Sequence, residues 1–150
     1  MSDLNVEKCK ELIYSGFKRI YLCGPMSGIK QFNFPLFDSV ARELRDVGFD
    51  VVSPAELDDP KTRKICLASP DGVHNANAQG STWEECLARD IKLIAEEDLD
   101  GIICLPGWTK SRGGNFEVAI ARSLSKPTYK YPKLGPVTHE PRLPFQESDE

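Results

Sequence analysis

The chain has 150 residues, 40% of them hydrophobic and 28% charged, which is the composition of one folded domain rather than of a disordered segment. Its net charge of −4 excludes the basic surface with which proteins bind nucleic-acid polymers, although a small phosphorylated ligand needs only a few local donors. No apolar run reaches the ~18 residues of a membrane span, and the N-terminal segment has no signal-peptide core. We therefore expect a cytoplasmic protein with no membrane partner.

Helices are predicted where apolar residues recur at helical spacing, namely over 4–15, 33–48, 81–98 and the segment after Asn115 that contains Glu117. Asn33 is the predicted N-cap of the second helix, and Ser81 with Glu84 or Thr82 with Glu85 forms the predicted capping box of the third. Strands are predicted at the apolar runs 19–25, 49–54, 101–106 and 127–131.

This alternation of strands and helices predicts a three-layer α/β sandwich with a parallel sheet of four or five strands. Ligands of such sheets bind beyond the carboxyl ends of the strands. In this chain those ends are the Gly-, Pro- and Ser-rich segments "CGPMSG", "SPAEL" and "LPGWTKSRGGN". The topology therefore predicts the functional loops without the help of any motif.

A single domain is expected over residues 1–131, with two stretches that fit no element. Residues 58–80 form a polar insertion, which is either a functional lid or disordered. Residues 132–150 form a proline-rich arm, either loose or lying on a neighbouring subunit. Neither stretch has the periodicity that would build a core of its own.

Metal and redox chemistry are not expected from this sequence. The two histidines are far apart, and the five cysteines lack Cys-x-x-Cys spacing: Cys9, Cys23, Cys66, Cys86 and Cys104. We interpret these cysteines as reduced thiols and expect neither a metal ion nor a cofactor.

The segment "CGPMSG" follows the first predicted strand and is a candidate phosphate cradle. The residues after Cys23 are Gly24, Pro25, Met26 and Ser27. All of them except Pro25 would offer a backbone N–H group, and Ser27 would add its hydroxyl. The segment matches neither the Walker A motif nor the dinucleotide fingerprint, so a tight turn without a ligand is the alternative.

Two carboxylates are candidate catalytic residues. Asp90 lies in the middle of a predicted helix, where no capping role explains it, although an ion pair with Arg89 or Lys92 would. Glu117 begins a helix, where it could serve the helix dipole or be presented to a ligand and kept ionised, as a nucleophile requires. The glycines before Glu117 favour a close approach to a ligand, and an aromatic residue nearby offers a stacking surface: Gly113, Gly114 and Trp108.

Three blocks carry a family resemblance: "IYLCGPMSG", then "RDI" followed by "DGIICLPGW", then "SRGGNFEVAIA". In this order and spacing they resemble the nucleoside 2-deoxyribosyltransferase superfamily over about residues 19–130. The likeness is greatest to its deoxyribosyltransferase-like domains of unknown function and to its 2′-deoxynucleoside 5′-phosphate N-hydrolases. The resemblance implies a flavodoxin-like sheet, cleavage of an N-glycosidic bond, and a homodimer or higher homo-oligomer.

The family's functional residues fall on matching positions of this chain. The resemblance implies that Glu117 is the nucleophile, that Asp90 supports it, and that Tyr21 orients it. Six residues before the nucleophile, transferases of free nucleosides carry an aspartate and 5′-monophosphate hydrolases a serine. This chain has Ser111, flanked by Lys110 and Arg112, which favours a monophosphate because a carboxylate would repel it.

Two features depart from the family pattern: the glycine two residues before the nucleophile is Asn115 here, and the insertion over residues 58–80 has no counterpart in the compact hydrolases of the family. The expected function is hydrolysis of the base–sugar bond of a (deoxy)nucleoside 5′-monophosphate through a covalent glycosyl-glutamate. The alternatives are a non-catalytic protein that binds a nucleotide or an ADP-ribose-like signal, and a nucleoside deoxyribosyltransferase. The sequence identifies neither the base nor the sugar.

Overall fold

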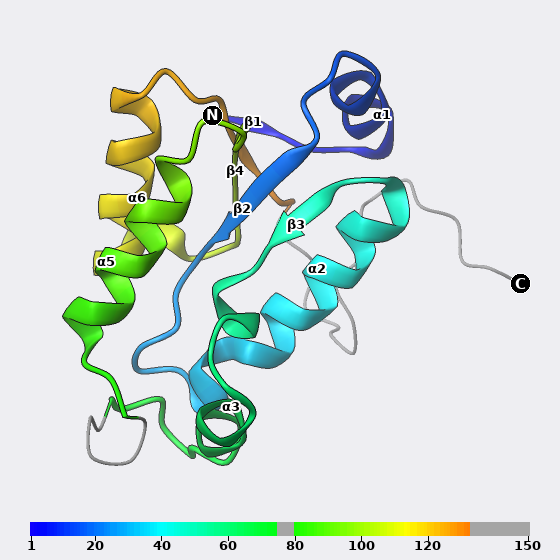
Figure 1. The fold of residues 1–150 in the computed structure, drawn as a ribbon. Coiled ribbons are helices and arrows are strands. Elements are labelled where there is room, and N and C mark those ends of the chain that lie inside the picture. Colours follow the sequence, from blue (N-terminus) through cyan, green and yellow to red (C-terminus); the bar gives the residue numbers. More distant parts are fainter. Residues whose placement is uncertain (75–79, 133–150) are drawn as a thin grey trace, which may run out of the picture.

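A five-stranded parallel sheet forms the centre of the computed structural model, which describes residues 1–74 and 80–132 (Figure 1). Its strands in chain order are β1 (Ser2–Asp3), β2 (Arg19–Cys23), β3 (Asp50–Val52), β4 (Gly101–Cys104) and β5 (Thr128–Lys130). In space the order is β1-β5-β4-β2-β3, with every neighbouring pair parallel. The chain therefore passes to one side of β2 for β3 and to the other side for β4, and this reversal marks a ligand-binding position in parallel sheets.

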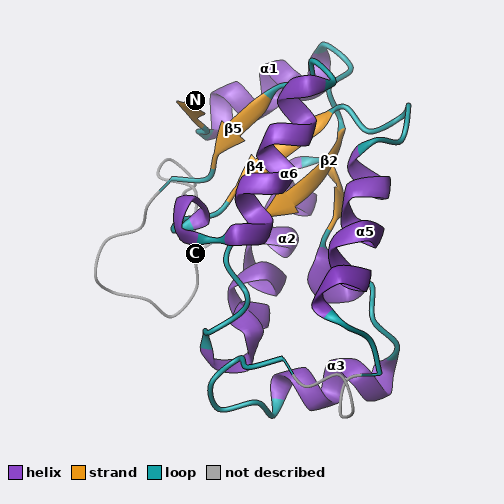
Figure 2. Ribbon diagram, turned by 90° about the vertical axis from the view of Figure 1, so that its left-hand side faces the viewer, coloured by secondary structure: helices purple, strands orange, loops and turns teal. Residues whose placement is uncertain are grey.

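Helices cover both faces of the sheet, which confirms the predicted three-layer α/β fold. They are α1 (Val6–Tyr14), α2 (Phe34–Val47), α3 (Pro60–Leu67), α5 (Trp83–Ile94) and α6 (Arg112–Ser123). Figure 2 shows α5 and α6 in front of the strands and α2 behind them, with α3 beyond the carboxyl ends of the strands. Across the described residues, no helix combines the length and the apolarity needed to cross a membrane.

The alternation of side chains along β2 divides the core into two layers. Ile20 and Leu22 are fully buried against α1 and α2, whereas Tyr21 and Cys23 are fully buried on the face covered by α5 and α6. Successive side chains of a strand point to opposite faces, so this division follows directly from the strand geometry. Tyr21 consequently lies on the same face as the two helices that carry the candidate carboxylates.

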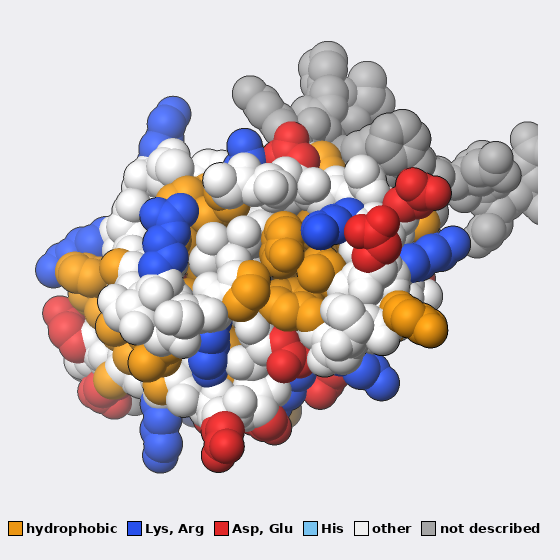
Figure 3. Space-filling view, turned by 90° about the horizontal axis from the view of Figure 1, so that it is seen from above, with side chains coloured by type: hydrophobic (Ala, Val, Ile, Leu, Met, Phe, Trp, Pro, Cys, Tyr) orange, Lys and Arg blue, Asp and Glu red, His pale blue; other side chains and the backbone are white. Residues whose placement is uncertain are grey.

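The amino ends of the strands carry an exposed ion-pair network. The Arg19 guanidinium lies 2.6 Å from Asp98, 3.4 Å from Glu96 and 3.7 Å from Asp50. Asp100 accepts a hydrogen bond from the backbone N–H of Arg19 at 2.9 Å. Figure 3, which views the molecule from this end, shows charged side chains of both signs around it. The network joins the starts of several elements at the surface.

Asn33 occupies the N-cap position of α2, as predicted, but without the expected capping geometry. Asn33 has a left-handed backbone (φ 61°) and makes no side-chain capping bond; its Nδ2 donates instead to the carbonyl of Pro25 at 2.9 Å. Gln31 and Phe32 before it are also left-handed, with φ values of 59° and 52°. The N–H of Gln31 donates to the carbonyl of Ser69 at 2.9 Å. Contacts with a distant segment therefore hold a backbone shape that local preference disfavours.

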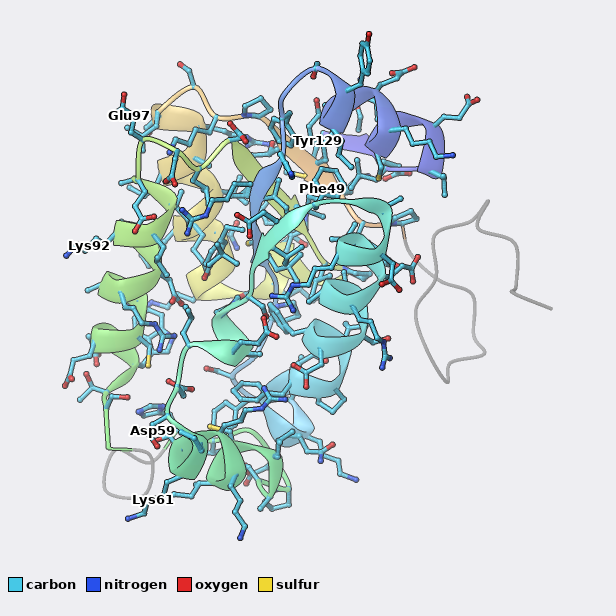
Figure 4. All side chains as sticks on the ribbon, turned by 45° about the vertical axis from the view of Figure 1, so that its right-hand side comes forward. Phe49, Asp59, Lys61, Lys92, Glu97 and Tyr129 are labelled. Atoms are coloured by element: carbon cyan, nitrogen blue, oxygen red, sulfur yellow. The ribbon has the colours of Figure 1, made fainter. Side chains whose placement is uncertain are left out.

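The insertion predicted over 58–80 contains a helix. In α3, the Asp59 side chain caps the first turn by accepting from the N–H of Thr62 at 2.8 Å. Figure 4 shows Asp59 and Lys61 at the start of this helix, below the sheet. Residues 75–79 of the insertion lie outside the described residues. The predicted arm from residue 132 also lies outside them, apart from Pro132.

Candidate active site

A pocket of about 320 Å³ lies at the carboxyl ends of β2 and β4, beside the reversal of strand order. Its walls come from the loop after β2, the start of α6, the inner side of α5 and the segment around α3. The sequence-predicted site residues that line it are Gly24, Pro25, Met26, Ser27, Asp90, Ser111, Arg112, Gly113 and Glu117. The structure therefore brings together residues from three separate blocks of the sequence.

Four predicted site residues do not line the pocket. Tyr21 is fully buried beneath it, and Trp108 packs against the hydrophobic cluster on the α5–α6 side. Asn115 turns its side chain amide back to donate to the carbonyls of Thr109 (2.9 Å) and residue 111 (2.8 Å). Gly114 is buried where a Cβ would approach the Trp108 carbonyl to 3.1 Å. Gly114 therefore allows the segment around Trp108 to pack closely against the start of α6.

Gly24 has a similar packing reason for its small size. A Cβ on Gly24 would lie 2.9 Å from the Cβ of Leu105, which is closer than two carbon atoms approach. The loop after β2 can therefore leave the sheet beside the end of β4 only if residue 24 is a glycine. This contact positions the following residues, Pro25 to Ser27, on the pocket wall.

Glu117 lies in the second turn of α6, because the helix begins at Arg112 and not after Asn115 as predicted. Its carboxyl is buried, and its Oε2 atom has no hydrogen-bond partner among the described residues. Burial raises the pKa of Glu117 to about 8, with further raising by the Asp90 carboxylate. Tyr21 opposes this rise. The expectation that the helix start keeps Glu117 ionised therefore does not hold for the free protein, since burial outweighs the helix dipole.

Asp90 lies on the inner side of α5 and is also buried. Of its two predicted ion-pair partners, Arg89 is the one present, with Nε 3.0 Å from Asp90 Oδ1. Lys92 points away from the body of the protein (Figure 4). Burial raises the pKa of Asp90, while Arg89 and Tyr21 act against that rise. The predicted ion pair of Asp90 with Arg89 therefore exists, but Asp90 itself is buried and does not lie on the surface.

The Tyr21 hydroxyl lies near both carboxyls. It lowers the pKa of Glu117 and of Asp90, and burial together with these two carboxylates raises its own pKa well above the usual value. Its distances and angles nevertheless form no hydrogen bond with the described residues. Because Tyr21 is buried beneath the pocket, its hydroxyl acts on the two carboxyls and makes no part of the pocket wall.

The start of α6 offers donors to an anion. Ser111 is its N-cap, with Oγ accepting from the N–H of Gly114 at 3.0 Å. The first N–H groups of a helix have no acceptor within the helix, and the dipole adds partial positive charge there. The side chains of Lys110 and Arg112 line the same part of the pocket. This end of the pocket therefore suits a phosphate.

Sequence reasoning missed several pocket residues, among them Trp83, Arg89 and Asp58. Trp83 lies under the guanidinium of Arg112, whose central carbon is 4.5 Å from the ring centroid. Arg89 bridges Asp90 and Asp58, with Nη1 2.9 Å from Asp58 Oδ1. Trp83 directly follows the capping residue Thr82 and Arg89 directly precedes Asp90, so their positions on one helix were the available signal. For Asp58 the sequence offered none.

Among the residues that the structure describes, no group of three or more His, Cys, Asp or Glu side chains could hold a metal ion. The pocket wall carries two buried carboxyls, Glu117 and Asp90, and three cationic side chains, Arg89, Lys110 and Arg112, with the Tyr21 hydroxyl buried beneath it.

Comparison with known proteins identifies a family but no individual relative. The family described as "Domain of unknown function (DUF4406)" matches residues 18–129. No curated protein and no solved structure gives a significant match. The match covers the sheet from just before β2 to β5, and with it all the loops that form the pocket. The chain therefore belongs to the family of the domain of unknown function DUF4406.

Proposed function

We propose that the protein hydrolyses the bond between base and sugar in a (deoxy)nucleoside 5′-monophosphate, with Glu117 as the nucleophile. The observation that carries this proposal is the pair of buried carboxyls, Glu117 and Asp90, which lines a pocket at the reversal of strand order above Tyr21. Buried carboxyls are costly unless they have a use, and perturbed pKa values cluster at functional sites. The resemblance to nucleoside 2-deoxyribosyltransferases and to 5′-phosphate N-hydrolases supports the same function.

The chemistry requires a carboxylate at the sugar. As the bond between the anomeric carbon and the base nitrogen breaks, its electron pair leaves with the base, which takes up a proton. The ionised Glu117 then forms an ester with the anomeric carbon, and water hydrolyses that ester and regenerates the carboxylate. Asp90 would stabilise the positive charge that develops on the sugar. Only molecules with an ionised Glu117 can start this sequence.

The phosphate end of the pocket supports a monophosphate rather than a free nucleoside. Ser111 supplies a hydroxyl, the start of α6 supplies N–H groups, and Lys110 and Arg112 supply positive charge. Charge-assisted bonds of this kind are the strong ones, and arginine matches phosphate geometry especially well. A transferase of free nucleosides would be expected to carry an acceptor for the 5′-hydroxyl at position 111. The homo-oligomeric state and the cytoplasmic location are part of this proposal.

A second candidate is a protein of the same fold that binds a nucleotide or an ADP-ribose-like signal without turning it over. The pKa of about 8 for Glu117 favours it, since most molecules would carry an uncharged Glu117 at neutral pH. Asp90 is moreover already held by Arg89. A site in this state binds a ligand readily but attacks it only slowly.

Incubation with a panel of nucleosides and nucleotides, with free base measured by chromatography, separates the two functions. Base release from a 5′-monophosphate supports the enzyme, and thermal stabilisation without release supports the binder. Glu117→Gln should lower release at least a hundredfold while the fold is retained, because the amide cannot form the ester. Glu97→Gln is the matched control, since Glu97 is exposed beyond the end of α5 (Figure 4). Near-normal release by a folded Glu117→Gln protein would exclude Glu117 as the nucleophile.

A further inference from the structure

Arg89 joins the candidate active site to the segment that the family resemblance does not account for. Its Nε donates to Asp90 Oδ1 at 3.0 Å, and its Nη1 donates to Asp58 Oδ1 at 2.9 Å. The side chains of Asp58 and Asp90 are only 15% and 12% exposed, so both contacts are sheltered from solvent. Asp58 directly precedes Asp59, the N-cap of α3. One guanidinium therefore fixes two carboxylates that come from different parts of the chain.

The two buried carboxyls of the site are not equivalent. Asp90 has a cation in contact, whereas Glu117 has no ion pair among the described residues and keeps Oε2 unpartnered. A guanidinium stays protonated and stabilises an adjacent carboxylate far more inside a protein than in water. Two neighbouring carboxyls that cannot both ionise keep one proton between them, and the one without the cation retains it.

We propose that Arg89 is the positioning residue of this site: anchored by Asp58, it keeps Asp90 ionised and oriented, and so leaves the proton of the carboxyl pair on Glu117. Asp58 has a supporting part, because it holds the guanidinium through Nη1 while Asp90 contacts Nε. The segment that begins at Asp58 thereby sets the charge of the site as well as lining its wall. The effect on base release rests on the proposed function, whereas the placement of the proton does not.

The other groups around the two carboxyls do not reverse this assignment. The titratable or charged groups near Glu117 are Tyr21 and Cys23 on β2, Cys104 on β4, and Arg89 and Asp90 on α5. Those near Asp90 are Arg89, Tyr21, Asp58, Cys86 and Glu117. Tyr21 acts on both carboxyls in the same direction, so it does not distinguish them. Lys110 and Arg112 line the pocket from the start of α6 without an ion pair to either carboxyl among the described residues.

Carbon-13 NMR of the side-chain carboxyls in the unliganded full-length protein tests the proposal without any substrate. Asp90→Asn and Glu117→Gln identify the two signals. We expect Asp90 to titrate at lower pH than Glu117 in the wild type. Arg89→Gln should raise the midpoint of Asp90 by at least one pH unit. Arg89→Lys should give a smaller rise. Asp58→Asn should change the midpoint least, because the guanidinium remains and loss of the Asp58 charge itself lowers the pKa of Asp90.

Arg19→Gln is the matched control, because Arg19 also bridges carboxylates but lies at the opposite end of the sheet. It should leave both midpoints unchanged. If Arg89→Gln fails to fold, Arg89→Lys decides by the same criterion. An Asp90 midpoint that ignores both Arg89 substitutions, or that lies above that of Glu117 in the wild type, would overturn the proposal. If base release is found, the pH profile of kcat/KM should shift to lower pH in Arg89→Gln, because a proton held on Asp90 leaves Glu117 ionised, while a wild type that releases no base refutes only the proposed function.

Discussion

At the amino ends of the strands, Arg19 reaches three acidic side chains that are 37% to 69% exposed. At the carboxyl ends, Arg89 reaches Asp58 and Asp90, which are 15% and 12% exposed. Each arginine bridges carboxylates and is about equally exposed (29% and 31%), so the difference lies in the carboxylates, which water screens much more at the first end than at the second. Exposed pairs of this kind contribute about 0–1 kcal/mol, whereas removing one partner from a buried pair costs about 3–5 kcal/mol. The same residue types thus hold elements together at one end and set protonation at the other.

The two ends of the sheet also differ in whether their polar groups have hydrogen-bond partners. Around Arg19, the Asp100 carboxylate accepts from the backbone N–H groups of Lys18 and Arg19 at 2.8 and 2.9 Å. Around Arg89, by contrast, the Tyr21 hydroxyl and Glu117 Oε2 are buried without partners among the described residues. Of these two groups, Glu117 lines the pocket, where a bound ligand can supply a partner. This difference is a better guide to function than the presence of charge.

The largest expected effect is on stability, and Glu117→Gln should show it. The pKa of Glu117 is about 8 in the folded protein, against 4.5 for a free side chain. Between these values the native state holds a proton that the unfolded state has lost, so stability falls as pH rises. Relative to Glu117→Gln, the wild type should lose up to about 5 kcal/mol from pH 4.5 to 8, as measured by urea unfolding. Parallel stability curves for the two proteins would place the proton elsewhere, and Glu97→Gln should follow the wild type.

The pH profile of catalysis should carry the same signature. If ionised Glu117 is the nucleophile, kcat/KM for a monophosphate should rise about tenfold per pH unit below pH 7 and level off near pH 8. The sign follows from the raised pKa, because acid removes the reactive form. Initial rates of base release across this range measure the effect. A flat profile between pH 6 and 8 would mean that the carboxyl is already ionised when substrate binds.

Ser111→Asp should distinguish the phosphate end of the pocket from an ordinary helix start. Aspartate is as good an N-cap as serine, so α6 should form normally. Like charges at ~4 Å with an effective dielectric near 20 repel by about 4 kcal/mol, which solvent and the nearby Lys110 and Arg112 reduce. We expect a loss of about one to three powers of ten in monophosphate affinity. The matching nucleoside should bind as well as before or better, so calorimetry with both ligands that shows equal weakening would contradict a phosphate site.

The smallest effect should come from the amino end. Arg19→Gln removes three exposed ion pairs, and we expect a destabilisation of about 0–1 kcal/mol that shrinks as salt is added. Ligand affinity and base release should not change. A large loss of stability, or any change in activity, would break the contrast between the two ends of the sheet.

The fold could be predicted because its signals are local. Apolar runs and helical periodicity identified four of the five strands, and the capping box of α5 forms between Thr82 and Glu85, where the N–H of Glu85 donates to the Thr82 hydroxyl at 3.1 Å. The two-residue β1 was missed because Ser2 and Asp3 are exposed and carry no apolar pattern. The helix within residues 58–80 was missed for the opposite reason, since its polar composition hides a helix that Asp59 caps.

The site was predicted only in part, because its properties depend on long-range packing. Sequence patterns and the family resemblance predicted that Glu117, Asp90 and Tyr21 belong to one site. They could not show that Asp58 reaches Arg89 across 31 positions, nor that burial outweighs the helix dipole at Glu117. The missing capping bond of Asn33 has the same origin, since distant carbonyls fix the left-handed turn around it. Sequence motifs can therefore identify the residues of a site, whereas their protonation depends on tertiary contacts.

The edge strand β1 has a consequence for how the chain folds. Ser2 pairs with Tyr129, and Leu4 donates to the carbonyl of Lys130 at 2.8 Å, so the first described residues pair with nearly the last. During synthesis this ladder has to wait until β5 has emerged and joined β4, and such distant pairings slow folding. With only two residues, β1 should also be the first strand to open in the native state. Backbone amides at this edge should therefore exchange with solvent long before those of β2 and β4, which stay closed until the whole domain unfolds.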